Sequence, residues 1–152
     1  MPMINMIHNI KYRLFVYNDE DEDKLLEGLN YIFPDILPEK EEAQGIFGED
    51  DEIIIYSGII TKKRHTKEFL NNLLENLSTD DIKKLYNDLD KKTDEQCNLF
   101  LRLSKEAIQD EKFIILDGGD SIHLKIKIAA FPAKKEIAIK NMKEFLYEYI
   151  NN

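Results

Sequence analysis

Residues 10–17 read IKYRLFVY, and this stretch decides the class of fold. Ile10, Tyr12, Leu14 and Val16 alternate with the residues at 11, 13, 15 and 17, which is the period-2 pattern of a strand with one buried face. Such a strand needs a layer of helices or a second sheet to cover its apolar side.

The residues that follow this strand predict a helix and a second strand. The acidic run 18–23 suits a helix N-terminus, where carboxylates meet the positive end of the helix dipole. Apolar side chains recur at helical spacing over 25–33, and Pro34 ends that helix. Residues 34–52 form a polar, acidic connection. Residues 53–60 are apolar and rich in β-branched side chains, which predicts a strand covered on both faces.

The middle of the chain predicts two helices and a third strand. Apolar stripes at helical spacing occupy 69–77 and 82–89. Residues 78–81, Ser-Thr-Asp-Asp, resemble a capping box in which Asp replaces Glu, so the second helix begins there. Residues 99–103, LFLRL, alternate again and predict a strand.

The last third of the chain completes the predicted fold. Strands at 112–116 and 122–130 flank Asp117-Gly118-Gly119-Asp120, a strong hairpin signal. A helix runs from Pro132 to about Ile150. The predicted order is β-α-β-α-α-β-β-β-α, an α+β fold with a mostly antiparallel sheet and helices packed on one face. Without repeats or a flexible linker, residues 1–152 are expected to form a single domain.

Charge is unevenly distributed along the 152 residues, whose net charge is −9. Residues 1–52 hold four Lys/Arg against fourteen Asp/Glu, whereas residues 53–152 hold 17 against 16. Any anion-binding site must therefore be local. No apolar run approaches the ~20 residues that span a bilayer, and no secretory signal is evident, so no membrane contact is expected. The single Cys97 excludes an internal disulfide, which favours a reducing, cytoplasmic location.

Catalytic and cofactor motifs are absent from the sequence. His8, His65 and His123 are far apart and match no metal-binding pattern. Cys97 stands in no recognisable nucleophile motif, and Asp117 and Asp120 are explained by a turn without a metal. No glycine-rich nucleotide loop occurs. We therefore expect a protein that is not an enzyme, with no cofactor and no metal.

Basic and aromatic side chains gather at the positions opposite the buried ones. If helices cover one face, the open face carries Lys11, Arg13, Phe15, Phe100, Arg102, His123, Lys125 and Lys127. Cations suit phosphates, and exposed rings suit unpaired bases, so this face favours RNA. Polar residues also cover any half-exposed antiparallel sheet, and an aromatic among them can pack across strands, so this alternative stays open.

Two lysines at the predicted start of the last helix add a second candidate. Lys134 and Lys135 oppose the helix dipole there, but with free backbone N–H groups they would form a phosphate seat. A solvated helix face is the alternative. Lys125 and Lys127 lie just upstream, which favours the phosphate interpretation.

Three segments carry a family resemblance. They are Ile7–Ile10 (IHNI), Leu99–Ala107 (LFLRLSKEA) and Ile126–Glu136 (IKIAAFPAKKE). With the order of elements, they resemble a family of small archaeal RNA-binding proteins described as predicted exosome subunits. The resemblance implies an α+β fold akin to that of a ribosomal RNA-binding protein, without nuclease activity of its own. Its partners would be RNA and exosome or other RNA-processing proteins.

The sequence departs from the family in one loop. Gly45-Ile46-Phe47-Gly48 is followed by four acidic residues, 49–52, where the family has Asn-Pro, and carboxylates there would repel phosphate. Residues 45–52 are therefore left out of the predicted site. The predicted RNA-binding residues are Phe100, Arg102, Lys105, Lys125, Lys127, Lys134 and Lys135.

The leading hypothesis is thus a non-catalytic RNA-binding protein, accessory to RNA processing or exosome-linked degradation. A protein-interaction module is the alternative. In it, the open sheet face or an edge strand pairs with a second copy of the chain or a larger partner, without direct RNA contact.

Overall fold

The computed structural model describes residues 6–44 and 52–151, and six of their segments form one antiparallel sheet. The strands are β1 (Ile7–Val16), β2 (Glu39–Gln44), β3 (Glu52–Ile60), β4 (Asn98–Ser104), β5 (Ile115–Leu116) and β6 (Ser121–Ile128). Across the sheet their order is β2-β3-β1-β6-β4-β5. The long strands β1 and β6 therefore lie at its centre.

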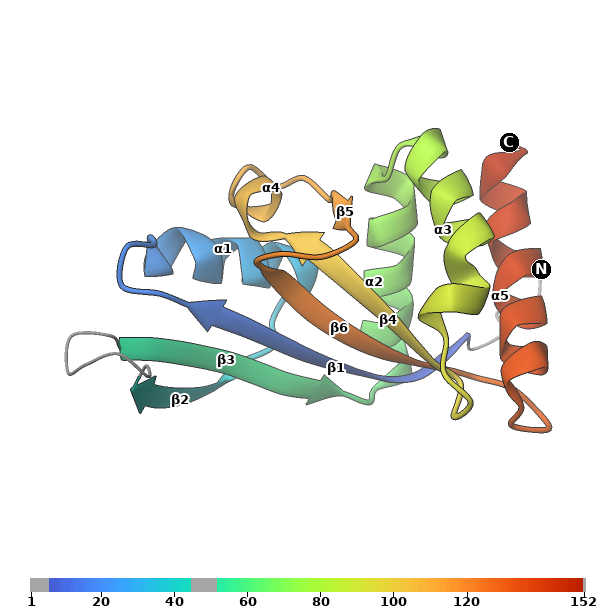
Figure 1. Cartoon of the computed structure of the whole chain (residues 1–152), viewed down its shortest axis with the longest axis horizontal. Coiled ribbons are helices and arrows are strands. Elements are labelled where there is room, and N and C mark those ends of the chain that lie inside the picture. Colours follow the sequence, from blue (N-terminus) through green and yellow to red (C-terminus); the bar gives the residue numbers. More distant parts are fainter. Residues whose placement is uncertain (1–5, 45–51, 152) are drawn as a thin grey trace.

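Helices cover one face of this sheet and leave the other open (Figure 1). They are α1 (Glu22–Ile32), α2 (Lys63–Asn76), α3 (Thr79–Lys92), α4 (Lys105–Gln109) and α5 (Lys135–Ile150). The predicted α+β class and order of elements are confirmed, with β2 and α4 as two short additions. None of the helices in the described ranges has the length and apolar character of a membrane-spanning segment.

Because side chains alternate along each strand, most apolar residues of the sheet face the helices. Ile10, Leu14, Leu103 and Ile122 are fully buried, and they belong to the same core cluster as Phe69 of α2. The residues between them, such as Lys11 and Arg13 on β1, are exposed. The pattern at 10–17 thus identified the two faces of the sheet.

The predicted helix starts are largely confirmed by their caps. The Asp21 side chain accepts a hydrogen bond from Lys24 N at 3.2 Å, and Ser78 accepts one from Asp81 N at 3.1 Å. Both satisfy backbone donors that the first helical turn leaves unpaired. The last helix begins at Lys135, three residues later than Pro132.

The strand at 53–60 was wrongly predicted to be covered on both faces. β3 occupies these residues, with Tyr56 and Ile60 buried on the helix side, but Ile59 is 63% exposed on the open side. Its β-branched composition reflects a pleated strand between two neighbours, β2 and β1, rather than burial on both sides.

The predicted hairpin around 117–120 is also wrong. β5 is only two residues long and pairs with β4, through Arg102↔Leu116 and Leu103↔Ile115. The Asp-Gly-Gly-Asp loop therefore crosses from one side of β4 to the other instead of joining paired strands. Gly119 takes φ 84°, so the glycines do make the turn that their sequence indicates.

Candidate nucleic-acid interface

Two rows of side chains cross the open face, because the strands pair in register. The lysine row runs Phe100, Lys125, Lys11, Ile59 over β4, β6, β1 and β3. The arginine row runs Arg102, His123, Arg13, Ser57, Glu39 over the same strands and β2. The rows are neighbours, since residues two apart on a strand share a face.

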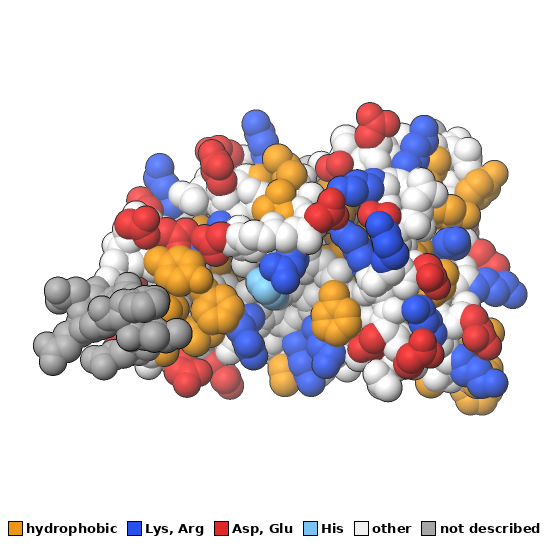
Figure 2. All heavy atoms as spheres, viewed as in Figure 1, with side chains coloured by type: hydrophobic (Ala, Val, Ile, Leu, Met, Phe, Trp, Pro, Cys, Tyr) orange, Lys and Arg blue, Asp and Glu red, His pale blue; other side chains and the backbone are white. Residues whose placement is uncertain are grey.

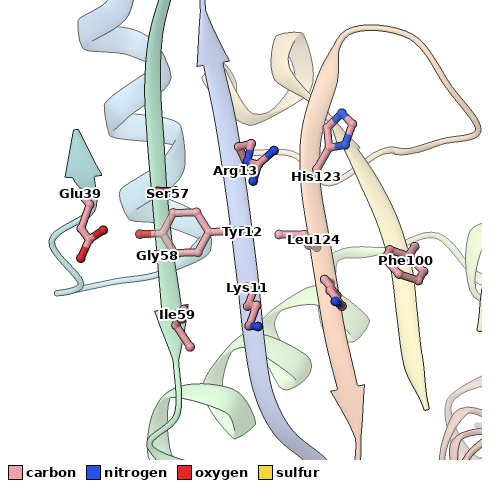
Figure 3. Close-up of a pocket in the computed structure, with 11 residues that line it drawn as sticks. Lys11, Tyr12, Arg13, Glu39, Ser57, Gly58, Ile59, Phe100, His123 and Leu124 are labelled. Carbon is pink, nitrogen blue, oxygen red and sulfur yellow. The ribbon is translucent and has the colours of Figure 1, made fainter. Parts of the chain in front are cut away.

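All members of both rows except Arg102 line a shallow hollow of about 610 Å³ (Figure 3). On its helix side, Tyr12 extends from β1 across β3 at Gly58, and its ring stacks on Phe33 with centroids 4.7 Å apart. A side chain at position 58 would occupy that space, because a Cβ there would lie 2.6 Å from the Tyr12 hydroxyl oxygen. Gly58 therefore lets the core pack closely beneath the hollow.

The lysine row has an exposed apolar side chain at each end. Phe100 is 46% exposed and Ile59 is 63% exposed. The Lys125 Nζ lies 6.0 Å from the centroid of the Phe100 ring, within the range of a cation–π contact. Along this line, two lysines thus lie between two exposed apolar side chains.

The arginine row is held together by contacts among its own members and their neighbours. Arg102 Nη1 donates to the Gly119 carbonyl at 3.2 Å and lies 3.4 Å from His123 Nε2. The edge of the Phe15 ring meets His123 with centroids 6.4 Å apart, and the Arg13 guanidinium lies 6.0 Å from that ring.

His123 is less basic than an ordinary histidine. Partial burial lowers its pKa, and the positive charges of Arg102 and Arg13 lower it further, while Asp120 acts in the opposite direction. The imidazole is therefore mostly neutral at pH 7. An anion bound between the two guanidinium groups would counter their positive charges, and it would thereby raise the pKa of His123.

The open face is basic in its middle and acidic at one edge. Five cations lie on β1, β6 and β4, namely Lys11, Arg13, Arg102, Lys125 and Lys127. On β2, Glu39 and Glu41 share the open face by alternation. Figure 2 shows this side of the molecule, with Lys and Arg side chains and hydrophobic side chains around a histidine. The basic strip is about two strand spacings wide, on the order of 10 Å.

Lys105, which we predicted to bind RNA, does not belong to this face. It is only 4% exposed, and its Nζ donates to the Phe15 carbonyl and the Glu20 carboxylate, each at 2.6 Å, and to Asp120 at 3.0 Å. The ammonium also lies 4.8 Å from the Tyr17 ring centroid. With these partners it joins the β1–α1 loop to the loop before β6, a structural role that leaves no donor directed at a phosphate.

The other predicted site residues fall into two groups. Phe100, Arg102, Lys125 and Lys127 share the open face, although Lys127 Nζ also donates to the Gln96 carbonyl. Lys134 and Lys135 lie at the beginning of α5, beyond the end of β6 and outside the lining of the hollow. Lys135 Nζ is 3.8 Å from Asp90 of α3.

Of the residues that line the hollow, the predicted site contained only Phe100 and Lys125, and it lacked Lys11, Arg13 and Ile59 among others. The alternation at 10–17 had already put Lys11 and Arg13 on the open face, so a complete list of that face would have included them. Ile59 gave no such signal, because an apolar residue in an apolar strand looks like core. Residues 45–51 of the acidic loop lie outside the described part of the chain.

Within residues 6–44 and 52–151, no group of three or more His, Cys, Asp or Glu side chains is arranged to hold a metal ion. Asp117 accepts from Lys84 Nζ at 2.6 Å and lies 3.5 Å from Lys92. Asp120 pairs with Lys105. Both aspartates of the Gly-Gly loop are thus engaged by lysines.

Comparison with known proteins agrees with the character of this face. Residues 9–128 match the model of a family described as RNA binding. The chain belongs to this RNA-binding family, as its segments at 7–10, 99–107 and 126–136 suggested.

Individual relatives extend the match over nearly the whole chain. RNA-binding protein PAB1135 of Pyrococcus abyssi is 34% identical over 145 residues, which cover 91% of this chain and 93% of that protein. The structure of Mth689, a DUF54 protein from Methanothermobacter thermautotrophicus, has a TM-score of 0.80 at 38% identity. It covers 93% of this chain and 98% of its own. Protein AF2318, a DUF54 protein of an Archaeoglobus species, has a TM-score of 0.75 at 27% identity, covering 91% and 98%. The similarity therefore concerns the entire fold and not one motif.

Proposed function

We propose that the open sheet face binds RNA. The observation that carries this proposal is the convergence of five cationic side chains and Phe100 on one continuous surface, in a chain whose family is described as RNA binding. Phosphates would contact Lys11, Arg13, Arg102, Lys125 and Lys127. Lys134 and Lys135 would add attraction from the start of α5.

The electrostatics of the face make this binding local. The chain as a whole carries −9, so long-range attraction of a polyanion is weak, and affinity must come from the basic strip itself. Each phosphate neutralised on a single strand contributes about 0.7 to the slope of log affinity against log salt. Binding should therefore be modest and should weaken steeply with salt.

We further propose that the protein acts without catalysis, in the cytoplasm, as an accessory to RNA processing or degradation. The hollow offers cations, a ring and one histidine placed between two guanidinium groups, a set suited to holding a polyanion. RNA-processing proteins such as exosome subunits would be its protein partners. Intact RNA after prolonged incubation with the protein would agree with this role, and time-dependent cleavage would refute it.

The test of RNA binding is a titration of labelled RNA at about 50 and about 200 mM salt, using both single-stranded and duplex probes. Saturable binding of either form that weakens at the higher salt would support the proposal. Lys125→Gln should weaken it, whereas Lys112→Gln should not, because Lys112 is exposed on the loop after α4, away from the rows. If neither probe binds at either salt, the proposed function is wrong.

A further inference from the structure

We propose that the ligand of the open face is single-stranded RNA lying across the strands, with unpaired bases on Phe100 and Ile59. This inference rests on the proposed function and narrows it to one class of RNA. It is carried by the lysine row, in which two exposed apolar side chains enclose two lysines.

The spacing of the row suits a short stretch of extended nucleotides. Phe100 and Ile59 lie on strands three spacings apart, which places them about 14–15 Å from each other. Lys125 and Lys11 fill the two positions between them. The arginine row runs parallel to this line, about 7 Å away along the strands. Bases resting on one row thus leave their phosphates within reach of the other.

Exposed apolar side chains on an open sheet face favour unpaired bases. A base stacks on a ring only when its face is accessible, and pairing within a duplex hides that face. Duplex RNA is bound chiefly through phosphates and 2′-hydroxyls on both sides of its minor groove. Phe100 and Ile59 would gain little from such a surface and would remain exposed to water.

The acidic edge of the sheet also disfavours a duplex. Glu39 ends the arginine row, and Glu41 lies on the same face of β2. The cations of the open face are limited to β1, β6 and β4, so a second phosphate backbone would find few cations left and would bring phosphates close to these carboxylates.

The deciding experiment compares a labelled single strand of about 12 nucleotides with the blunt duplex formed from that strand and its complement, at equal salt. We expect the single strand to bind at least about tenfold more tightly. Equal or tighter binding of the duplex would overturn the inference while leaving RNA binding intact. Absence of binding to both would overturn the proposed function itself.

Variants at the two ends of the row test the base contacts directly. Phe100→Ala should weaken single-strand binding by about fivefold or more without changing its salt slope, since stacking involves no counterion release. Ile59→Thr, which keeps a β-branched side chain in β3, should weaken it by a smaller factor. Tyr147→Ala is the matched control, because Tyr147 is an aromatic residue of α5 with 59% exposure. If Phe100→Ala binds like the parent, or no worse than Tyr147→Ala, the inference is wrong.

Discussion

Arg102 Nη1 lies 3.4 Å from His123 Nε2, and the two side chains occupy paired positions on β4 and β6. Arg13 pairs with His123 from the other side, on β1. A neutral imidazole between two guanidinium groups is thus fixed by strand register. We expect this arrangement to make the binding of anions at the face depend on pH.

RNA affinity should increase as the pH falls from about 7.5 to about 5.5. In the free protein, burial, Arg102 and Arg13 lower the pKa of His123 below its usual 6.5. A phosphate between the guanidinium groups favours the imidazolium and raises that pKa, so binding takes up a proton. Affinity measured across this range for the parent and for His123→Gln tests the idea. The variant should show a flatter pH dependence, and an unchanged one would rule out His123 as the cause.

The same residue should reduce the stability of the free protein in acid. Because its pKa is lower in the folded state, the unfolded chain binds the proton first as the pH falls through about 6.5. The His123 contribution to stability is therefore present above that pH and is lost below the folded-state pKa. Denaturant unfolding at about pH 7.5 and 5.5 should show a smaller loss for His123→Gln than for the parent.

Removing the two central lysines should change the salt dependence of binding. In Lys11→Gln/Lys125→Gln, the slope of log affinity against log salt should decrease by about 1.4, or ~0.7 for each phosphate that is no longer neutralised. The double variant Lys67→Gln/Lys112→Gln has the same net charge and serves as the control. An equal decrease in both would mean that overall charge, rather than the face, governs binding.

Reversing the charges at the start of α5 should have a smaller effect. Lys134→Glu/Lys135→Glu lies outside the hollow, and Lys135 already has Asp90 3.8 Å away. We expect a weaker loss of RNA affinity than for Lys11→Glu/Lys125→Glu at about 0.15 M salt, where screening limits charges to about 8 Å. A greater loss would move the centre of the site to α5, and no loss would remove this pair from it.

Lys105→Met should lower the free energy of unfolding by about 2 kcal/mol, because the hydrogen bonds of its buried ammonium to charged groups are lost. The Phe15 carbonyl loses its donor as well, while the Glu20 and Asp120 carboxylates are partly exposed and can be hydrated. Chemical denaturation measures the loss, with the exposed Lys112→Met as control. At a temperature where the variant is folded, its RNA affinity should stay close to that of the parent. A large loss of affinity would return Lys105 to the binding site.

Gly58→Ala should destabilise the protein by about 1–3 kcal/mol through overpacking. The added Cβ would lie 2.6 Å from the Tyr12 hydroxyl oxygen and 2.8 Å from two ring carbons, and the ring is held against Phe33. Gly118→Ala adds the same methyl group where nothing lies within 4 Å. Equal stability of the two variants would show that Tyr12 moves freely.

The sequence predicts well which face of the sheet lies against the helices. It predicts poorly which strands pair with one another. Alternation at 10–17 identifies both faces because only one of them is buried. β2, with the sequence EKEEAQ, contains no apolar alternation, so it gives no strand signal of its own. β5 pairs with β4, and no pattern in the residues around β5 indicates that pairing.

The local sequence likewise does not show that a charged residue will be buried. Lys105 looks like any exposed lysine until the fold brings Glu20 and Asp120, 85 and 15 residues away, to its ammonium. The part of the site that was predictable is the part set by strand alternation. Ile59 and Lys105 depend on which elements pack next to them.

The charged outer strand β2 also bears on how molecules of this protein meet one another. Its Glu39, Lys40, Glu41 and Glu42 surround backbone groups at the edge of the sheet, where a strand from another molecule would have to pair. Charges at such an edge oppose that pairing and the aggregation that follows from it. At the opposite edge, β5 offers only two residues. Edge-to-edge polymerisation of these sheets should therefore be slow even at high protein concentration.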